Sequence, residues 1–214
     1  MKIEFVTDFV CPYCIVAKEA IKKVARDFDL DVEIETIPFE LTVEPKERVD
    51  TYSDPVRREH YKVLEEPSRV LGLDAKFPPR VIPRPYSRLA FEGWHFAEEN
   101  GKGDVYADAV YAAYFIDEQD IGEPDVLTAI AEKAGLDPTA FREALEQETY
   151  TAKQKEAREY SRNVLGVSSV PTIYVDGKKI ELESYMPEEV MKKLIERQAE
   201  ENSGGFFGCG EDGC

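Results

Sequence analysis

The chain has 214 residues, enough for one large domain or for a small domain that carries an insertion. Lysine and arginine total 27 and aspartate and glutamate total 44, so the net charge is −17 and phosphate is repelled, which disfavours DNA or RNA as a partner. No apolar run approaches the length of about 18 residues that predicts a membrane span, so we expect no membrane partner. The first nine residues, MKIEFVTDF, lack the apolar stretch of a signal peptide, and we expect a cytoplasmic protein.

The chain opens with a pattern typical of a strand, a helix and a second strand. Residues 2–7 alternate polar and apolar side chains and predict the first strand. A CPYC motif follows at 11–14, and apolar residues at helical spacing from Ala17 to Phe28 predict a helix behind it. Pro12 suits a first helical turn, where its missing N–H is not needed. Residues 32–37 alternate again and predict the second strand.

The middle of the chain is predicted to be helical. Between residues 41 and 165 we expect helices at 54–71 with a kink or break at Pro67, 87–99, 104–116, 124–134, 138–145 and 149–164. The proline-rich stretch FPPRVIPRP at 77–85 predicts a loop with polyproline character.

Strand patterns return near the end of the chain. Residues 172–175 and 179–182 flank Asp176-Gly177, a strong hairpin signal, and a final amphipathic helix begins at Pro187. The order β-α-β, helical block, β-β-α predicts an α/β protein with a thioredoxin fold and a large all-helical insertion. We divide the chain into a thioredoxin-like domain, a helical insertion domain and a flexible tail, which occupy 1–40 with 166–200, 41–165, and 201–214 respectively.

The four cysteines form two close pairs, Cys11–Cys14 and Cys209–Cys214, too few for a disulfide-built scaffold. At a helix N-terminus the Cys11 thiolate is stabilised by unpaired N–H groups and the helix dipole. Cys14, one turn later, is then placed to attack a mixed disulfide. We therefore predict that Cys11 is the nucleophile and Cys14 the resolving thiol. Zinc ligation is the alternative, but the folded part offers only two histidines and no second short-spaced cysteine pair.

A proline at the start of the third strand is the second signal. In GVSSVPT, residues 166–172, Pro171 enters the strand, and we predict a cis Val170–Pro171 bond beside the cysteines. Val170 would then offer its backbone to an extended substrate, as a sheet edge does to an added strand. We expect Pro12 and Tyr13 to contact substrate as well.

The segments FVTDFVCPYC and GVSSVPTIYVDGK, with the helical insertion between them, resemble the DsbA-like oxidoreductases, specifically their cytosolic FrnE-type branch. PFEL at 38–41, RPYSRLA at 84–90, YFIDEQDIGEPDVL at 114–127 and GLDPTAFREAL at 135–145 extend the resemblance over nearly the whole chain. It implies thiol–disulfide exchange with protein or peptide substrates through Cys11 and Cys14, with Pro171 beside them. For such a reaction we expect no tightly bound cofactor and no metal, and glutathione and thioredoxin are the candidate recycling partners.

The dipeptide between the cysteines departs from that family, which often carries Pro-His or Pro-Trp there. Pro12-Tyr13 also occurs in glutaredoxins, so it does not assign the direction of electron flow. Because Tyr13 does not become positively charged, it lacks the help that a histidine lends to a thiolate. We therefore expect a less oxidising pair than in the strongly oxidising periplasmic members.

Two other classes of function fit parts of the pattern. Kappa-type glutathione transferases and hydroxychromene-carboxylate isomerases share the architecture, but they use a single hydroxyl or thiol at the position of Cys11 and bind glutathione. The intact CxxC motif argues against that class. A zinc-binding or redox-sensing module that uses both cysteine pairs is the non-enzymatic alternative.

Other polar candidates receive a structural interpretation. His60 and His95 lack a partner motif and are interpreted as packing or surface residues. Arg80, Arg84 and Arg88 cluster near the proline-rich loop, where they would contact an anionic substrate or glutathione; charge balance on an acidic protein is the preferred interpretation.

Several apolar side chains have two interpretations, as helix core or as the lining of a groove above Cys11. They are Trp94, Tyr111, Tyr114, Phe115, Phe39 and Leu41.

The last two cysteines enclose Gly-Glu-Asp-Gly, a turn-forming segment that lets their sulfurs meet. Some FrnE-type proteins carry a C-terminal Cys-x4-Cys, and this tail resembles that pattern. We predict that Cys209 and Cys214 form an auxiliary disulfide that exchanges electrons with Cys11. A static structural bridge and a metal clip are the alternatives.

Overall fold

The structure, a computed structural model, describes residues 1–184 and 186–204. The predicted tail pair Cys209 and Cys214 therefore lies outside the described residues. Among those described, no helix has both the length and the apolar character to cross a membrane.

The described strands form one mixed sheet in the order β2-β1-β3-β4. The strands are β1 (Lys2–Thr7), β2 (Glu33–Pro38), β3 (Thr172–Val175) and β4 (Lys178–Lys179). β1 runs parallel to β2 and antiparallel to β3, which pairs antiparallel with β4. The predicted thioredoxin fold with its helical insertion is confirmed, because the strands come from the two ends of the chain and the helices between β2 and β3 from its middle.

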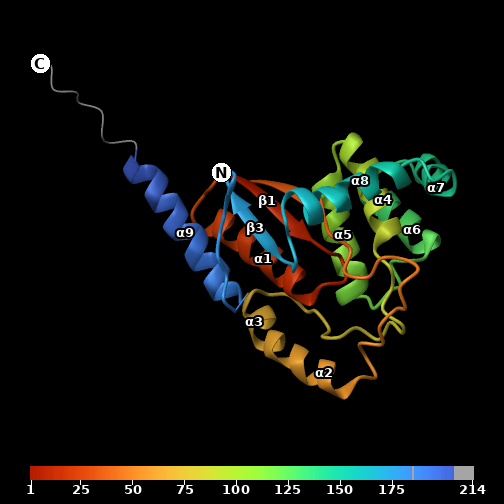
Figure 1. The fold of residues 1–214 in the computed structure, drawn as a ribbon, viewed down its shortest axis with the longest axis horizontal. Helices are drawn as coiled ribbons and strands as arrows, with labels where there is room; N and C mark the ends of the chain where they lie inside the picture. The colour runs from red at the N-terminus through yellow and green to blue at the C-terminus, as the bar shows by residue number, and fades with distance from the viewer. Residues whose placement is uncertain (185, 205–214) are drawn as a thin grey trace, which may run out of the picture.

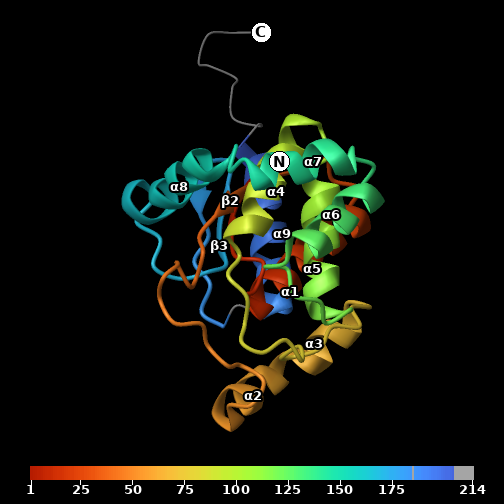
Figure 2. The same cartoon turned by 90° about the vertical axis from the view of Figure 1, so that its right-hand side faces the viewer.

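Helices surround this sheet. α1 (Pro12–Asp27) packs against α9 (Pro187–Gly204), and Figure 1 shows α9 on one side of the sheet and helices α4–α8 on the other. The insertion contains α2 (Pro55–Tyr61), a 3-10 turn (Lys62–Leu64), α3 (Glu65–Val70), α4 (Arg88–Glu99), α5 (Gly103–Phe115), α6 (Pro124–Lys133), α7 (Pro138–Glu146) and α8 (Thr151–Glu159), which a π-helical turn continues over Tyr160–Val164. Figure 2 shows α2 and α3 set apart from the rest of the insertion, near the start of α1.

The predicted helix over 54–71 differs from the observed structure. The chain breaks at Lys62–Leu64, where the fully buried Leu64 enters the core, rather than at Pro67. Pro67 is the third residue of α3, where a backbone N–H has no partner within the helix, so the ring is tolerated.

The final hairpin has the predicted turn but a shorter second strand. Asp176 and Gly177 have φ angles of 47° and 75°, as the two central residues of a type I′ turn require. β4 covers only Lys178–Lys179 instead of the predicted 179–182, and one further bond, from the Ile180 N–H to the Ile173 oxygen, follows it. The predicted loop at 77–85 forms neither helix nor strand, and its Phe77–Pro78 and Ile82–Pro83 bonds are cis, so it is not one continuous polyproline helix.

β1 is buried on both faces, which fixes the segment that follows it. Ile3 and Phe5 belong to the large core, whereas Val6 joins Ile37, Phe39 and Val167 in a second cluster. Just beyond β1, the Phe9 ring lies 4.4 Å from that of Phe91 on α4 and 5.1 Å from that of Tyr111 on α5, measured between centroids. The insertion therefore shares a core with the sheet and holds the chain immediately before the CPYC motif.

Candidate active site at the start of helix α1

The two cysteines lie at the beginning of α1, as predicted. Cys11 is the N-cap residue, with extended backbone angles, and Pro12 occupies the first helical position. The Cys14 N–H donates to the Cys11 carbonyl oxygen at 3.1 Å, which closes the first turn. Both are free thiols; Cys11 retains 4% of its exposure and Cys14 has none. The first cysteine is therefore the more exposed of the two.

Burial gives Cys14 the character of a protonated thiol. Loss of hydration raises its pKa well above the usual value, and the neighbouring Cys11 raises it further through a hydrogen bond and through charge repulsion. Hydrogen bonds with Thr7 and with the backbone of Asp8 oppose this shift without reversing it. The site thus combines an accessible thiol with a buried one that needs help to ionise.

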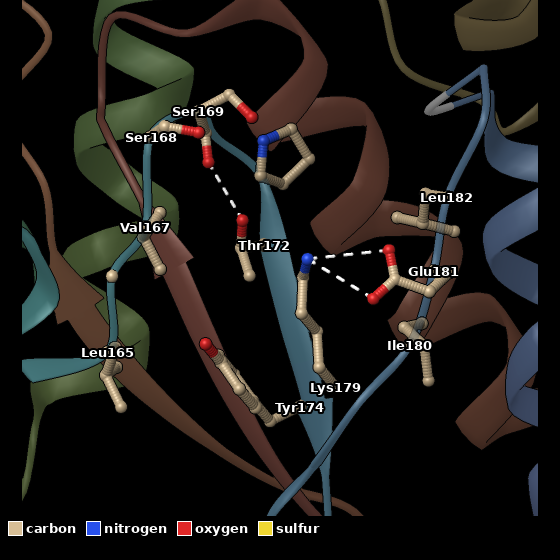
Figure 3. A pocket seen from close by; sticks show the side chains of 12 residues that line it. Leu165, Val167, Ser168, Ser169, Thr172, Tyr174, Lys179, Ile180, Glu181 and Leu182 are labelled. Atoms are coloured by element: carbon tan, nitrogen blue, oxygen red, sulfur yellow. Dashed lines mark hydrogen bonds and ion pairs between the residues drawn. The ribbon is translucent and has the colours of Figure 1, made fainter.

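The segment before β3 lies directly against Cys11. The Val170–Pro171 peptide bond is cis, and Cys11 Sγ donates to the Val170 carbonyl oxygen at 3.6 Å. Thr172 Oγ1 donates to the Ser169 oxygen at 2.8 Å and braces this turn, as Figure 3 shows. The sequence predicted this approach from two motifs that lie 159 residues apart.

A small pocket lies between this turn and β4. Its volume is about 90 Å³, and it contains neither cysteine. Lys179 and Glu181 form an ion pair at 3.3 Å among its lining side chains (Figure 3). The pocket is too small for a peptide and has no contact with the thiol chemistry.

A larger cavity of about 690 Å³ opens beside Cys11. Its lining comes from the start of α1, the loop after β2, α2, the proline-rich loop and the segment before β3, and consists of Cys11, Pro12, Tyr13, Leu41, Thr42, Lys46, Val49, Asp54, Val56, Arg57, His60, Tyr61, Arg84, Ser168, Ser169 and Val170. This volume lies in the range that binds small molecules or a short peptide segment. Cys11, Pro12, Tyr13 and Val170 therefore share one cavity; Pro171 borders the smaller pocket on the other side.

A buried carboxylate fixes the loops at the entrance to α1. Asp8 is fully buried and accepts hydrogen bonds from the N–H of Val10, at 3.2 Å, and from the N–H of Leu41. Its own main-chain oxygen accepts from the Cys11 N–H at 3.0 Å. Asp8 thereby joins the segments that follow β1 and β2 and sets the position of Cys11.

His60, interpreted from the sequence as a packing or surface residue, lies in the cavity wall. Its Nε2 is 3.1 Å from the Tyr13 hydroxyl, so α2 is tied to the dipeptide between the cysteines. His95 follows the sequence interpretation: it is buried, bonds to Gln154 at 3.0 Å, and burial lowers its pKa to about 4.

The three arginines near the proline-rich loop separate in the structure. Arg80 is exposed and lies 4.0 Å from Glu118, and Arg88 forms ion pairs with Glu44 and Glu92. The preferred interpretation of these two arginines, that they balance nearby acidic charge, agrees with these contacts. Arg84 differs, because it is 8% exposed, lines the cavity and forms no ion pair with a described residue.

The apolar candidates divide between core and cavity. Leu41 lines the cavity, whereas the others are buried in the core: Phe39, Trp94, Tyr111, Tyr114 and Phe115. Tyr111 is linked to the site through Thr7, because its hydroxyl hydrogen-bonds to the Thr7 hydroxyl and Thr7 in turn hydrogen-bonds with Cys14. Among the side chains that the structure describes, no group of three or more His, Cys, Asp or Glu residues is placed to hold a metal ion.

The model of the DSBA-like thioredoxin domain matches residues 2–196. The chain belongs to this family. A Bacillus subtilis relative, the uncharacterized protein YwbO, is 38% identical over 174 residues, which cover 81% of this chain and 86% of the relative.

Solved structures confirm the fold of this DSBA-like protein. The probable DsbA oxidoreductase SCO1869 from Streptomyces coelicolor matches with a TM-score of 0.74 at 23% identity, over 94% of this chain and 91% of the other. A 2-hydroxychromene-2-carboxylate isomerase matches with a TM-score of 0.73 at 20% identity, over 95% and 98%. At these identities the structures establish the shared architecture, and the chemistry has to come from the site itself.

Lys46, Asp54, Arg57 and His60 were not predicted as site residues. They lie in the loop after β2 and on α2, and they reach the cavity only because this segment folds back beside α1. No local motif marks them.

Proposed function

We propose that this DSBA-like protein is a cytosolic protein thiol–disulfide oxidoreductase that uses Cys11 and Cys14. The observation that carries the proposal is the pairing of Cys11, which lines the large cavity at a helix N-cap, with a fully buried Cys14 one turn later. This difference in burial between the two thiols matches the division of roles between an attacking and a resolving cysteine.

In the reducing direction, the Cys11 thiolate attacks one sulfur of a substrate disulfide and displaces the other sulfur as a thiolate. Cys14 then loses its proton and attacks Cys11, which forms the Cys11–Cys14 disulfide and releases the second substrate thiol. Two electrons pass from the enzyme dithiol to the substrate. In the oxidising direction the same steps run in reverse. We propose that the substrate backbone docks along Val170 beside Pro171, with Pro12 and Tyr13 completing the contact surface.

The test is reduction of insulin disulfides, followed in wild type and in Cys11→Ser and Cys14→Ser variants. We expect Cys11→Ser to abolish turnover and Cys14→Ser to accumulate a mixed disulfide, detected as a mass increase that dithiothreitol reverses. A Cys14→Ser variant with full turnover would instead favour the single-thiol chemistry of the glutathione-dependent transferases and isomerases.

We further propose that glutathione or thioredoxin recycles the enzyme and that Cys209 and Cys214 act as an auxiliary redox pair. The spacing of those two cysteines supports the second proposal. A redox titration of the Cys11–Cys14 pair in wild type and Cys209→Ser tests it. An unchanged potential together with unchanged turnover would remove the auxiliary role, and metal analysis of the reduced protein would identify a metal clip.

A further inference from the structure

Arg84 is a buried guanidinium without a carboxylate partner among the described residues. It is 8% exposed, and its Nη2 donates to Thr42 Oγ1 at 2.9 Å. Its Nε atom has no hydrogen-bond partner within the part of the chain that the structure describes. A guanidinium carries five N–H donors, and an unpaired buried charge lowers the stability of the fold. A bound anion would pair with this charge and accept hydrogen bonds from the guanidinium.

The position of Arg84 connects that need to the thiol site. Its main-chain N–H donates to the Val49 oxygen at 2.9 Å, which holds the proline-rich loop against the loop after β2. Arg84 and Thr42 both line the 690 Å³ cavity that contains Cys11. Arg84 and Cys11 therefore border the same cavity, and a ligand that fills it can reach both side chains.

The charge of the cavity is opposite to that of the whole protein. The chain carries −17, yet the cavity is lined by three cationic side chains, Lys46, Arg57 and Arg84, and by one carboxylate, Asp54. Asp54 is already paired with Arg57 at 3.3 Å. The remaining positive charge lies on Arg84 in the wall and on the exposed Lys46. Such a local reversal of sign attracts an anionic ligand to Cys11.

We propose that Arg84 binds a carboxylate of the substrate and lets the site accept, besides protein disulfides, small carboxylate-bearing disulfides of about tripeptide size. The inference rests on the proposed thiol–disulfide exchange and names a substrate class for it. The guanidinium forms charge-assisted hydrogen bonds with the carboxylate, which holds the ligand with one sulfur at Cys11. Exchange then gives the Cys11–Cys14 disulfide and two small thiols, so the two electrons that the enzyme loses reduce one disulfide.

The experiment is single-turnover oxidation of the reduced full-length protein by two probes. Glutathione disulfide carries carboxylates, and bis(2-hydroxyethyl) disulfide is neutral. The reaction is quenched with acid and remaining thiols are alkylated, so that mass spectrometry counts oxidised protein. Each rate constant is divided by that of dithiothreitol with the same disulfide, which removes the intrinsic reactivity of the probe.

We expect wild type to prefer glutathione disulfide after this correction. Arg84→Gln should lower the rate constant for glutathione disulfide about 10- to 100-fold, the loss typical of a hydrogen bond to a charged group, and change that for the neutral probe less than about twofold. Arg84→Lys keeps the positive charge but lacks the planar guanidinium that donates two parallel hydrogen bonds. It should lower the rate constant for glutathione disulfide by an intermediate factor. Arg80→Gln is the matched control on the same loop, and we expect it to leave both rate constants unchanged.

Equal loss with both probes would assign Arg84 a structural role and overturn the proposal, as would no loss with either. If Arg84→Gln does not fold, the Arg84→Lys variant and the wild-type preference decide, and a wild type without preference overturns the proposal. If wild type reduces insulin but neither probe oxidises it, the Arg84 proposal is overturned and the proposed function stands. If wild type also fails to reduce insulin, the proposed function itself fails, which is a different result.

Discussion

The sulfur of Cys11 lies 3.6 Å from the main-chain oxygen of Val170, although 159 residues separate them in the chain. The contact places the accessible thiol against the backbone that we propose receives the substrate. It depends on β1 and β3 pairing side by side, because each site segment sits at the end of one of these strands. A substrate sulfur attacked by Cys11 would thus lie beside the segment that leads into β3.

The buried position of Cys14 predicts selective alkylation. Because burial and the neighbouring Cys11 raise the pKa of Cys14 well above its usual value, Cys14 stays protonated at neutral pH. In a Cys209→Ser/Cys214→Ser background, a brief treatment of the reduced protein with iodoacetamide at pH 7 should add one group, at Cys11. Peptide mass spectrometry checks the position. Alkylation of Cys14 at a similar rate would contradict the assigned roles.

A histidine in place of Tyr13 should make the pair more oxidising. The imidazolium would stabilise the Cys11 thiolate of the reduced form, which a neutral phenol does not. We expect Tyr13→His to raise the reduction potential by about 30 mV or more, equivalent to about tenfold in the equilibrium constant. Equilibration with glutathione buffers measures it.

Tyr13→Phe is the matched control, since it removes the bond to His60 without adding charge. If Tyr13→Phe raises the potential as much as Tyr13→His does, the charge argument is wrong.

Asp8 should contribute several times more to the free energy of unfolding than a surface carboxylate that accepts the same number of backbone hydrogen bonds. Asp8→Ala leaves the Val10 and Leu41 N–H groups without their acceptor, at a cost of about 2–4 kcal/mol in the free energy of unfolding. Asp137 also accepts two backbone N–H bonds, at the start of α7, but in an exposed setting. Asp137→Ala should cost about 1 kcal/mol. Urea denaturation compares the two, and equal losses would refute the role assigned to burial.

His95 should make the protein lose stability in mild acid. Its pKa is about 4 in the folded protein and about 6.5 when unfolded, so the unfolded state binds the proton first as the pH falls. The contribution of neutral His95 to the free energy of unfolding is complete above pH 6.5 and is lost progressively between pH 6.5 and 4. Between pH 7 and 5 the free energy of unfolding falls by about 2 kcal/mol for this reason.

His95→Gln should abolish that part of the pH dependence, as urea denaturation at pH 7 and 5 would show. Glu40, whose pKa is raised chiefly by burial and which bonds to Gln154, is present in both proteins, so their difference isolates His95. The exposed residue His60 supplies the control: His60→Gln should lose stability in acid as wild type does. An unchanged acid loss in His95→Gln would exclude His95 as its source.

Much of the local architecture could be read from the sequence. Alternation marked β1 and β2, and Pro12 marked the start of α1. The short strand pattern before Asp176-Gly177 marked β3, and that dipeptide marked the turn into β4. Each of these follows from backbone preferences that act within a few residues. The break in the helix at 54–71 was misplaced because the burial of Leu64, a tertiary contact, outweighed the local signal of Pro67.

The sequence by itself determined the fold class and the positions of the two site cysteines, because CPYC at a helix start and Val-Pro at a strand start are local patterns in a fixed order. Only the tertiary structure decided which other side chains share their cavity. Arg80, Arg84 and Arg88 look alike in the sequence, yet Arg80 and Arg88 lie near carboxylates. Arg84, buried in the lining of the cavity that contains Cys11, forms no ion pair with a described residue. Burial and ion pairing depend on residues brought in from distant segments, and no local pattern records them.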